Sequence, residues 1–195
     1  MSLVLFRRPA VTLAAFLSLA GFAQAHPGHD GGGFVNGFAH PLHGPDHLLA
    51  MLAVGLWAAQ LGGRAKWAVP ASFVGVMALG GALGMAGVGL PVAEQGIAAS
   101  VLILGLLIAA AVRLPLAAGL AVVGIFALCH GYAHGAETPE TATDAVYALG
   151  FAGATALLHA CGFGLGVLMQ KWAKAEWLRA CGVAISTAGV LLLWS

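Results

Sequence analysis

Residues 40–47 read His40-Pro41-Leu42-His43-Gly44-Pro45-Asp46-His47, which places three imidazoles and a carboxylate within eight positions. An apolar run begins directly after this stretch. Ionisable residues beside or inside a membrane span are costly and are usually functional. Gly44-Pro45 should break the chain, because proline is favoured at the first position of a helix and an acidic residue in its first turn. We therefore expect a bent backbone here, with Asp46 and His47 opening a helix.

Outward from this stretch, the chain is a series of apolar runs separated by short polar breaks. Of its 195 residues, 61% are hydrophobic and 8% are charged, whereas a soluble domain carries about 25% charged residues. The runs are continuous, unlike the alternating strands of a β-barrel, and they approach the ~20 residues that a helix needs to cross the hydrocarbon core. The sequence therefore predicts an all-α integral membrane protein. It should be a six-transmembrane-helix bundle with spans at about 45–62, 67–87, 93–112, 115–134, 145–169 and 177–194.

The first 25 residues have the three parts of a secretory signal peptide. Arg7 and Arg8 precede an apolar run over residues 10–22, and Ala23-Gln24-Ala25 is typical of a cleavage site. An uncleaved first helix is the alternative, although the run is short for a span. We predict a cleaved signal peptide at 1–25.

The segment 26–44 would then form a periplasmic histidine-containing leader. His26 and His29 lie at the new N-terminus, where they could hold a divalent ion weakly. The alternative is a disordered polar leader, since chain termini are seldom ordered.

The basic residues predict the orientation of the spans. After the signal peptide, all of them fall in the breaks that follow the first, third and fifth spans: Arg64, Lys66, Arg113, Lys171, Lys174 and Arg179. The other breaks hold acidic residues and no Lys or Arg. Because cytoplasmic loops are enriched in Lys and Arg, we expect both termini on the periplasmic side.

A second cluster of candidate ligands ends the fourth predicted span. His130, His134 and Glu137 lie at a spacing that places them on one helix face, provided that the helix continues through the two intervening glycines. Imidazole and carboxylate groups suit Ni²⁺, Co²⁺, Zn²⁺ or Fe²⁺. The predicted orientation brings this end of the span to the same membrane face as residues 40–47. We therefore expect the two clusters to share one divalent metal site.

Two further polar residues have two interpretations each. Asp46 could ligate the ion beside His40 and His47, or could complement the positive N-terminus of its helix. His159, near the middle of the fifth span, could be a deeper ligand or relay. It could equally be a core residue bonded to a neighbouring carbonyl.

Three blocks of the sequence combine these features: His40-Pro41-Leu42-x-Gly44-x-Asp46-His47, His130-Gly131-x-Ala133-His134-Gly135-x-Glu137, and Ala154-Thr155-x-x-Leu158-His159-x-x-Gly162. Together they resemble the HupE/UreJ family of small nickel/cobalt permeases, over essentially the whole mature chain. The resemblance implies secondary uptake of Ni²⁺ or Co²⁺ across the bacterial inner membrane by a permease domain at 45–195. It also implies a functional link to hydrogenase or urease maturation.

The resemblance further implies a set of metal ligands: His40, Asp46, His47, His130, His134 and Glu137. His43 falls at a position that varies in the family, so its role is left open. The metal is cargo, so no resident cofactor is required. The expected partners are membrane lipid and the divalent ion, and a net charge of +1 gives no indication of nucleic-acid binding.

Two other functional classes could use the same ligands. A membrane metalloenzyme would need an open coordination position and a general base, which Glu137 could supply. However, no H-E-x-x-H motif occurs and the chain has no room for a substrate-binding domain outside the membrane. A metal sensor or accessory protein would bind the ion without moving it. We expect a transporter and no enzymatic activity.

Overall fold

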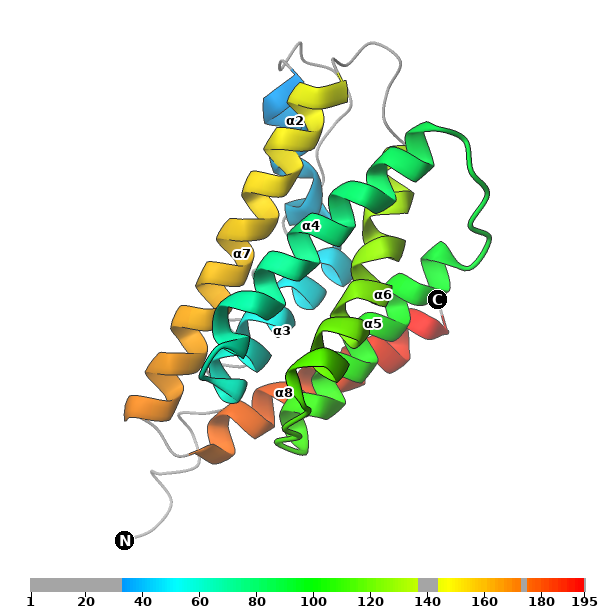
Figure 1. Ribbon diagram of the computed structural model, residues 1–195. Helices are drawn as coiled ribbons and strands as arrows, with labels where there is room; N and C mark the ends of the chain where they lie inside the picture. Colours follow the sequence, from blue (N-terminus) through cyan, green and yellow to red (C-terminus); the bar gives the residue numbers. More distant parts are fainter. Residues whose placement is uncertain (1–32, 137–143, 173–174, 195) are drawn as a thin grey trace, which may run out of the picture. The chain divides into compact units, whose positions relative to one another are not determined.

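The computed structural model describes residues 33–136, 144–172 and 175–194. Every regular element in these ranges is an α-helix (Figure 1), and the predicted all-α class is confirmed. The helices are α2 (Gly33–His43), α3 (Pro45–Leu61), α4 (Ala65–Met85), α5 (Ala93–Ala109), α6 (Leu116–Ala136), α7 (Asp144–Trp172) and α8 (Ala175–Leu193). The predicted signal peptide at 1–25, the leader residues His26 and His29, and Glu137 lie outside the described residues.

The helices α3 to α8 coincide closely with the six predicted spans. Four of them, α4, α6, α7 and α8, are long and apolar enough to cross a membrane. The helix α5 is apolar but has 17 residues, and α3 also has 17. At 1.5 Å per residue such a helix is about 25 Å long, shorter than the ~30 Å hydrocarbon core. Membrane-spanning length is therefore confirmed for four helices, and for α3 and α5 spanning stays a prediction.

The exterior of the bundle is apolar. Large hydrophobic side chains are exposed on most helices, among them Trp67, Ile125, Leu149 and Leu191, each at least 65% exposed. A soluble monomer rarely exposes apolar surface on this scale, and lipid is its natural environment. The surface thus agrees with the composition in identifying a membrane protein.

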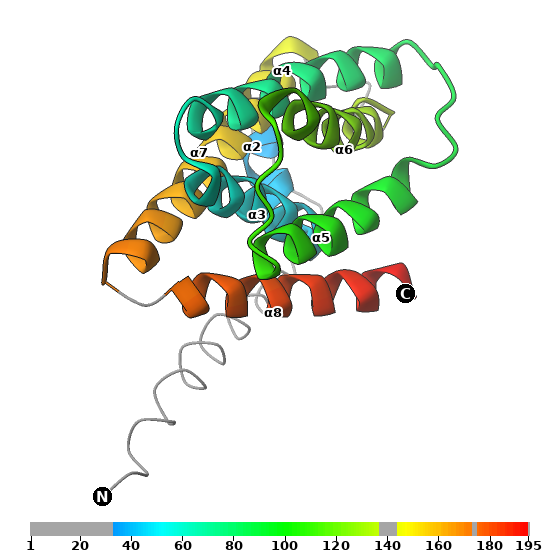
Figure 2. The same ribbon diagram turned by 60° about the horizontal axis from the view of Figure 1, so that its bottom comes forward.

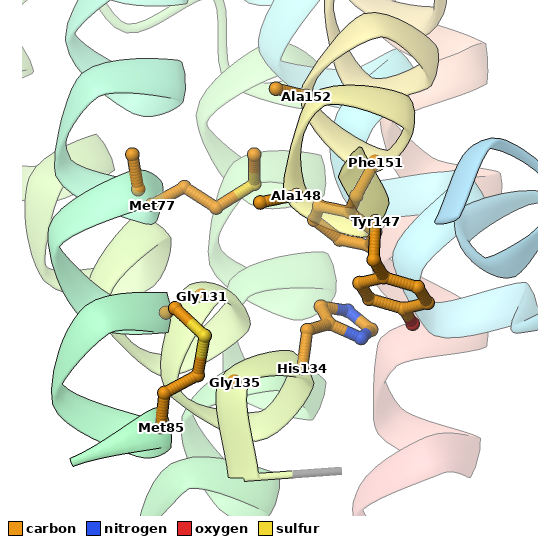
Figure 3. Close-up of a pocket in the computed structure, with 11 residues that line it drawn as sticks. Met77, Met85, Gly131, His134, Gly135, Tyr147, Ala148, Phe151 and Ala152 are labelled. Atoms are coloured by element: carbon orange, nitrogen blue, oxygen red, sulfur yellow. The ribbon is translucent and has the colours of Figure 1, made fainter. Parts of the chain in front are cut away.

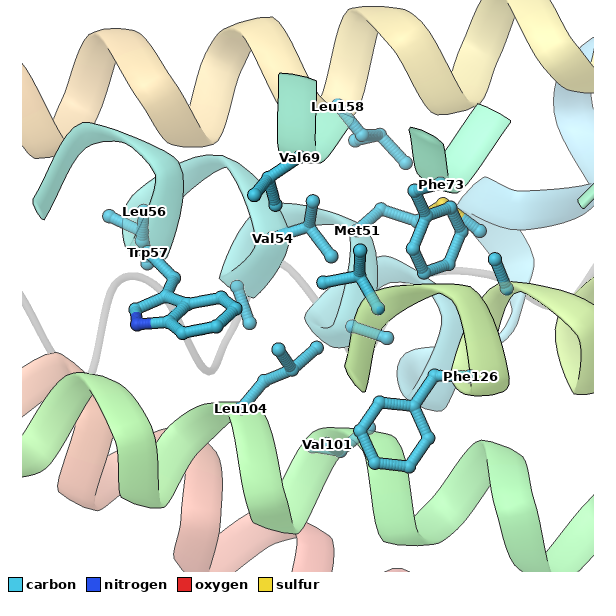
Figure 4. Packing of buried hydrophobic residues seen from close by; sticks show 14 of the residues in the cluster. Met51, Val54, Leu56, Trp57, Val69, Phe73, Val101, Leu104, Phe126 and Leu158 are labelled. Carbon is cyan, nitrogen blue, oxygen red and sulfur yellow. The ribbon is translucent and has the colours of Figure 1, made fainter. Parts of the chain in front are cut away.

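The helix α3 lies at the centre of the bundle, which explains how a short helix can have so few exposed residues. Met51, Val54 and Trp57 are fully buried and pack with Phe73 of α4 and Leu104 of α5 (Figure 4). A helix that is apolar on all sides is stable only when other helices surround it. The residues that open α3 are therefore held in place by α4, α5 and α7.

The stretch before Pro45 is a helix of its own. Helix α2 ends at His43, Gly44 is extended with φ −86° and ψ 118°, and α3 begins at Pro45. The predicted break is confirmed, because proline suits the first position of a helix. The helix α2 was not predicted, since its sequence contains Gly37 and Pro41, both poor helix formers.

Helix α2 forms because it packs closely against α7. A Cβ atom on Gly37 would collide with the backbone carbonyl of Tyr147, and one on Gly150 would collide with that of Phe34. The two helices can approach so closely only because both positions lack a side chain. The glycine that weakens α2 in isolation therefore stabilises it in the bundle.

Helices α4 and α6 approach each other in the same way. A Cβ on Gly131 would collide with the Met77 carbonyl, and one on Gly135 with the Gly81 carbonyl. Helices α5 and α8 also run side by side through glycine contacts (Figures 1 and 2). Small residues are the usual means of close helix packing in membranes. By contrast, Gly164 of α7 has open space at the position of its missing Cβ.

The basic residues gather at one end of the bundle. The α3–α4 and α5–α6 turns, the end of α7 and the start of α8 all lie there, at the bottom of Figure 1. Among the described residues, Arg64, Lys66, Arg113, Lys171 and Arg179 belong to this end. Because these basic residues occur only in every second break between the helices, they all lie at the same end of the folded bundle. Which side of the membrane they face stays a prediction.

Candidate metal-binding site

Four histidines from three helices lie together at the end of the bundle opposite the basic residues. The ring centroid of His47 in α3 is 4.4 Å from that of His134 and 4.8 Å from that of His130, both in α6. His40 in α2 lies 4.5 Å from His134. We refer to these four residues as the histidine cluster. The structure thus brings together candidates that lie more than eighty residues apart in the sequence.

Helix α6 presents two of these imidazoles because it continues through both of its glycines. His130 and His134 lie one turn apart and are 0% and 4% exposed. The glycine after each histidine packs on the backbone of α4. Because adjacent residues of a helix point about 100° apart, the imidazoles then face α2 and α3. One face of α6 therefore carries the glycines that pack against α4, and another carries the imidazoles of the cluster.

Asp46 orients His47. Its Oδ1 atom accepts hydrogen bonds from the backbone N–H of His47 at 2.7 Å and from His47 Nδ1 at 2.8 Å. An ionised carboxylate can only accept, so Nδ1 carries a hydrogen, and in the neutral imidazole Nε2 then keeps its lone pair. His47 Nε2 is buried and has no hydrogen-bond partner in the described ranges. A carboxylate that orients a metal-binding histidine in this way is a common support for metal ligands.

Ser100 of α5 orients the His130 ring, as Asp46 orients that of His47. The Ser100 hydroxyl donates to the Ile97 carbonyl at 2.6 Å and lies 3.0 Å from His130 Nε2. A hydroxyl has one hydrogen, so Ser100 must accept from His130 Nε2–H. His130 Nδ1 then holds a lone pair, and it is buried without a partner in the part of the chain that the structure describes. The hydrogen-bond network thus assigns the tautomers of His47 and His130.

Helix α7 closes the other side of the cluster with two aromatic side chains. The Tyr147 hydroxyl is 2.8 Å from His40 Nδ1, and the Phe151 ring centroid is 4.0 Å from that of His134. His134 and Tyr147 border a small cavity of ≈ 90 Å³ between α4, α6 and α7 (Figure 3). The cluster is therefore polar at its centre and walled by apolar groups, as a ligand pocket commonly is.

Two candidates lie apart from the cluster. His43 is exposed, and its Nδ1 lies 2.7 Å from the Ala39 carbonyl oxygen. His159 is only 3% exposed. The ring centroid of Phe73 is 5.6 Å from that of His130 and 5.1 Å from that of His159. Neither His159 nitrogen bonds to a carbonyl or to any other group among the described residues.

The imidazole rings of the cluster lie close together, but their nitrogens do not point toward one common position. Within the described residues, no three His, Cys, Asp or Glu side chains are arranged to hold a metal ion. The plane of the His47 ring makes an angle of 86° with the His130 ring and 63° with the His134 ring. Metal–imidazole bonds are about 2 Å long, so the rings would have to turn for one ion to bind several of them.

The residues that support the histidines were not predicted from the sequence. Ser100 is the sole hydroxyl in the predicted span 93–112, and a buried hydroxyl in an apolar span requires a hydrogen-bond partner. That requirement could have identified it. Tyr147 lies at the start of the fifth span, on the same predicted face of the membrane as the clusters, but nothing in the sequence pairs it with His40. Phe73 carries no signal that separates it from ordinary core residues.

These features define a helical, multi-pass membrane protein with four neighbouring histidines at one end of its bundle. The chain belongs to the HupE/UreJ family: residues 14–192 match the family described as HupE / UreJ protein. It is 46% identical over 188 residues to Protein HupE of Rhizobium leguminosarum bv. viciae, covering 96% of this chain and 98% of that protein. No solved structure matches the chain. The resemblance seen in the sequence is confirmed.

The family is one of membrane transporters rather than enzymes, and it is associated with nickel and cobalt uptake. Of the three functional classes considered from the sequence, the family assignment therefore favours the transporter over the metalloenzyme.

Proposed function

We propose that the protein takes up Ni²⁺ or Co²⁺ across the bacterial inner membrane, and that the histidine cluster captures the ion from the periplasmic side. One observation carries the proposal. Asp46 and Ser100 hold two neighbouring imidazoles in tautomers that leave one buried nitrogen on each, His47 Nε2 and His130 Nδ1, without a hydrogen-bond partner among the described residues. Leaving such an atom without a partner costs about 1–3 kcal/mol. Binding an ion would offset that cost.

The donor set fits the proposed cargo. Neutral imidazoles are borderline ligands that suit both Ni²⁺ and Co²⁺, so the proposal covers both ions. Asp46, through His47, and Glu137, just past the end of α6, would supply two negative charges to balance a divalent ion. His40 and His134 complete the candidate ligands, and His26 and His29 of the leader would meet the ion first. We further propose that both chain termini lie in the periplasm, after cleavage of a signal peptide at 1–25.

Capture would proceed by exchange of water for imidazole. A hydrated ion would exchange part of its water for the imidazole nitrogens of His47 and His130. The two rings would turn to bring these nitrogens together. Polar ligands within an apolar wall favour this exchange, because the wall excludes the water that is displaced. We propose that the ion imported in this way supplies the maturation of a nickel enzyme, such as hydrogenase or urease.

Uptake of ⁶³Ni²⁺ into proteoliposomes that contain only this protein tests the proposal. A transporter fills the vesicle interior with label that detergent releases. A sensor or accessory protein binds one or a few equivalents and no more, and a metalloenzyme moves no label. Unlabelled Co²⁺ and Ni²⁺ should compete with the label more effectively than Mg²⁺, which prefers oxygen ligands.

The matched pair His47→Ala and His43→Ala assigns the site. His47→Ala removes a ligand nitrogen of the cluster, whereas His43→Ala removes an exposed imidazole outside it. We expect uptake to fall at least tenfold in the first variant and to change less than twofold in the second. Equal uptake by the two variants would show that the cluster is not the capture site.

A further inference from the structure

Two cavities lie along the seam between α4 and α7, which run antiparallel. The first is the ≈ 90 Å³ space beside His134 and Tyr147 (Figure 3), which we call the cluster cavity. The second measures ≈ 410 Å³ and is bordered by His159, Lys66 and Trp67. Because Lys66 belongs to the basic end of the bundle, we call it the basic-end cavity. The seam therefore contains open space toward both ends of the bundle.

Buried side chains close the seam between these two spaces. Phe73, Met77 and Thr155 are each at most 3% exposed, and the Thr155 hydroxyl lies 3.7 Å from Met77 Sδ. The Phe73 ring centroid lies 5.6 Å from that of His130 in the cluster and 5.1 Å from that of His159. Phe73 is thus a buried aromatic residue next to both the cluster and His159.

His159 has the features of a binding residue rather than of a core residue. It is 3% exposed, and neither of its ring nitrogens has a hydrogen-bond partner among the described residues. Burial without a partner is unfavourable for a polar atom, so a core histidine would normally be bonded to a carbonyl. His159 instead borders the basic-end cavity, which is open to the surface of the bundle beside Trp67.

We infer that His159 is a second ion-binding position, on the far side of Phe73 from the histidine cluster. The ion is the Ni²⁺ or Co²⁺ of the proposed function, on which this inference rests. There the ion keeps water as its remaining ligands and leaves through the basic-end cavity. Passage from the first position to the second requires the Phe73 ring to move aside.

The surroundings of His159 suit release rather than storage. A single neutral imidazole holds a divalent ion weakly, and the ammonium group of Lys66 repels it. The Lys66 Nζ atom lies 5.5 Å from the centroid of the Trp67 ring, at the rim of the same cavity. Conduction requires sites from which an ion can leave as readily as it arrives. A strong cluster followed by a weak single ligand meets that requirement.

The test separates binding from transport. His159→Leu and His159→Gln are compared with Cys161→Leu, which places the same side chain at an exposed position on the same helix. Equilibrium binding of ⁶³Ni²⁺ is measured in detergent, initial uptake in proteoliposomes, and folding by the thermal midpoint of a fluorescence-detected gel-filtration assay. His159→Gln offers an amide oxygen as a weak ligand and keeps a polar group, so it remains informative if His159→Leu does not fold.

We expect both His159 variants to bind ⁶³Ni²⁺ within twofold of the unmodified protein. Initial uptake should fall at least tenfold in His159→Leu and less in His159→Gln, and Cys161→Leu should match the unmodified protein. Uptake within twofold of normal in a folded His159 variant would overturn the inference. So would parallel losses of binding and uptake, because His159 would then belong to the first site. Failure of the proposed function has a different signature, since normal uptake by His47→Ala would contradict it whatever His159 does.

Discussion

The Ser100 hydroxyl lies 3.0 Å from His130 Nε2 and donates its own hydrogen to the Ile97 carbonyl at 2.6 Å. This relationship makes a residue of α5, which contributes no ligand, responsible for the tautomer of a histidine in α6. Supporting partners of this kind typically change metal affinity 10–100-fold when they are removed.

Substitution of Ser100 should weaken metal binding without unfolding the protein. In Ser100→Ala the Nε2–H of His130 loses its acceptor, so the ring is free to adopt the tautomer whose lone pair points away from the cluster. We expect the Kd for Ni²⁺ to rise about 10–100-fold, measured by equilibrium binding in detergent.

The control is Ser186→Ala in α8. Ser186 is also buried and donates to a carbonyl three residues earlier, that of Val183, at 2.9 Å. It lies on a different helix from all four clustered histidines. A Kd that rises equally in both variants would show that loss of a buried hydroxyl, and not the tautomer of His130, is responsible.

Asp46→Asn tests the same logic on α3. Asparagine keeps the shape of the side chain but can turn an NH₂ donor toward His47 Nδ1, which favours the wrong tautomer. We expect initial ⁶³Ni²⁺ uptake to fall at least tenfold with little change in thermal stability. Glu176→Gln, which neutralises an exposed acid in the first turn of α8, should leave uptake unchanged. Normal uptake by Asp46→Asn would remove the carboxylate from the mechanism.

Tyr147→Phe should have a smaller effect. It removes the hydroxyl that lies 2.8 Å from His40 Nδ1 but keeps the ring, whose centroid is 6.1 Å from that of His40. A net hydrogen bond contributes about 0.5–1.5 kcal/mol, so the Kd for Ni²⁺ should rise roughly 2- to 12-fold. A titration with ⁶³Ni²⁺ measures it. A loss as large as that of His47→Ala would mean that the hydroxyl itself ligates the ion.

Gly131→Ala should destabilise the protein. The new methyl group would collide with the Met77 carbonyl, and overpacking of this kind costs about 1–3 kcal/mol. The collision would also push α6 away from α4 and displace His130. We expect a lower thermal midpoint and weaker binding of ⁶³Ni²⁺.

Gly164→Ala supplies the comparison for that variant. Gly164 lies on α7 with nothing near the position of its missing Cβ, so alanine should be neutral or stabilising through its higher helix propensity. A thermal midpoint that falls as much in Gly164→Ala as in Gly131→Ala would refute the packing explanation.

The sequence predicted the parts of the fold that depend on local chemistry. Pro45 marked the start of α3, and the spacing of His130 and His134 marked one face of α6. Apolar length identified the spans, because the cost of exposing a backbone to lipid leaves helices as the main solution. These features depend on a residue and its near neighbours, which a sequence displays directly.

What the sequence could not supply depends on distant partners. Helix α2 exists because Gly37 packs on the backbone of α7, and a pattern of glycine and proline in isolation argues against a helix. The supporting role of Ser100 depends on a partner thirty residues away. Aromatic residues such as Phe73 are chemically alike wherever they are buried, so the closeness of Phe73 to two histidines appears only once the helices are assembled.

The alternation of histidine and glycine in α6 also limits how this site could be borrowed by protein engineers. Grafting the imidazoles alone onto another helical scaffold would omit the surface that fixes their direction. For the two imidazoles of α6, the smallest transferable unit is the pair α4 and α6 with their backbone contact intact, together with the serine of α5. A designer would therefore have to transfer the α4–α6 interface in order to keep the α6 imidazoles in their observed direction.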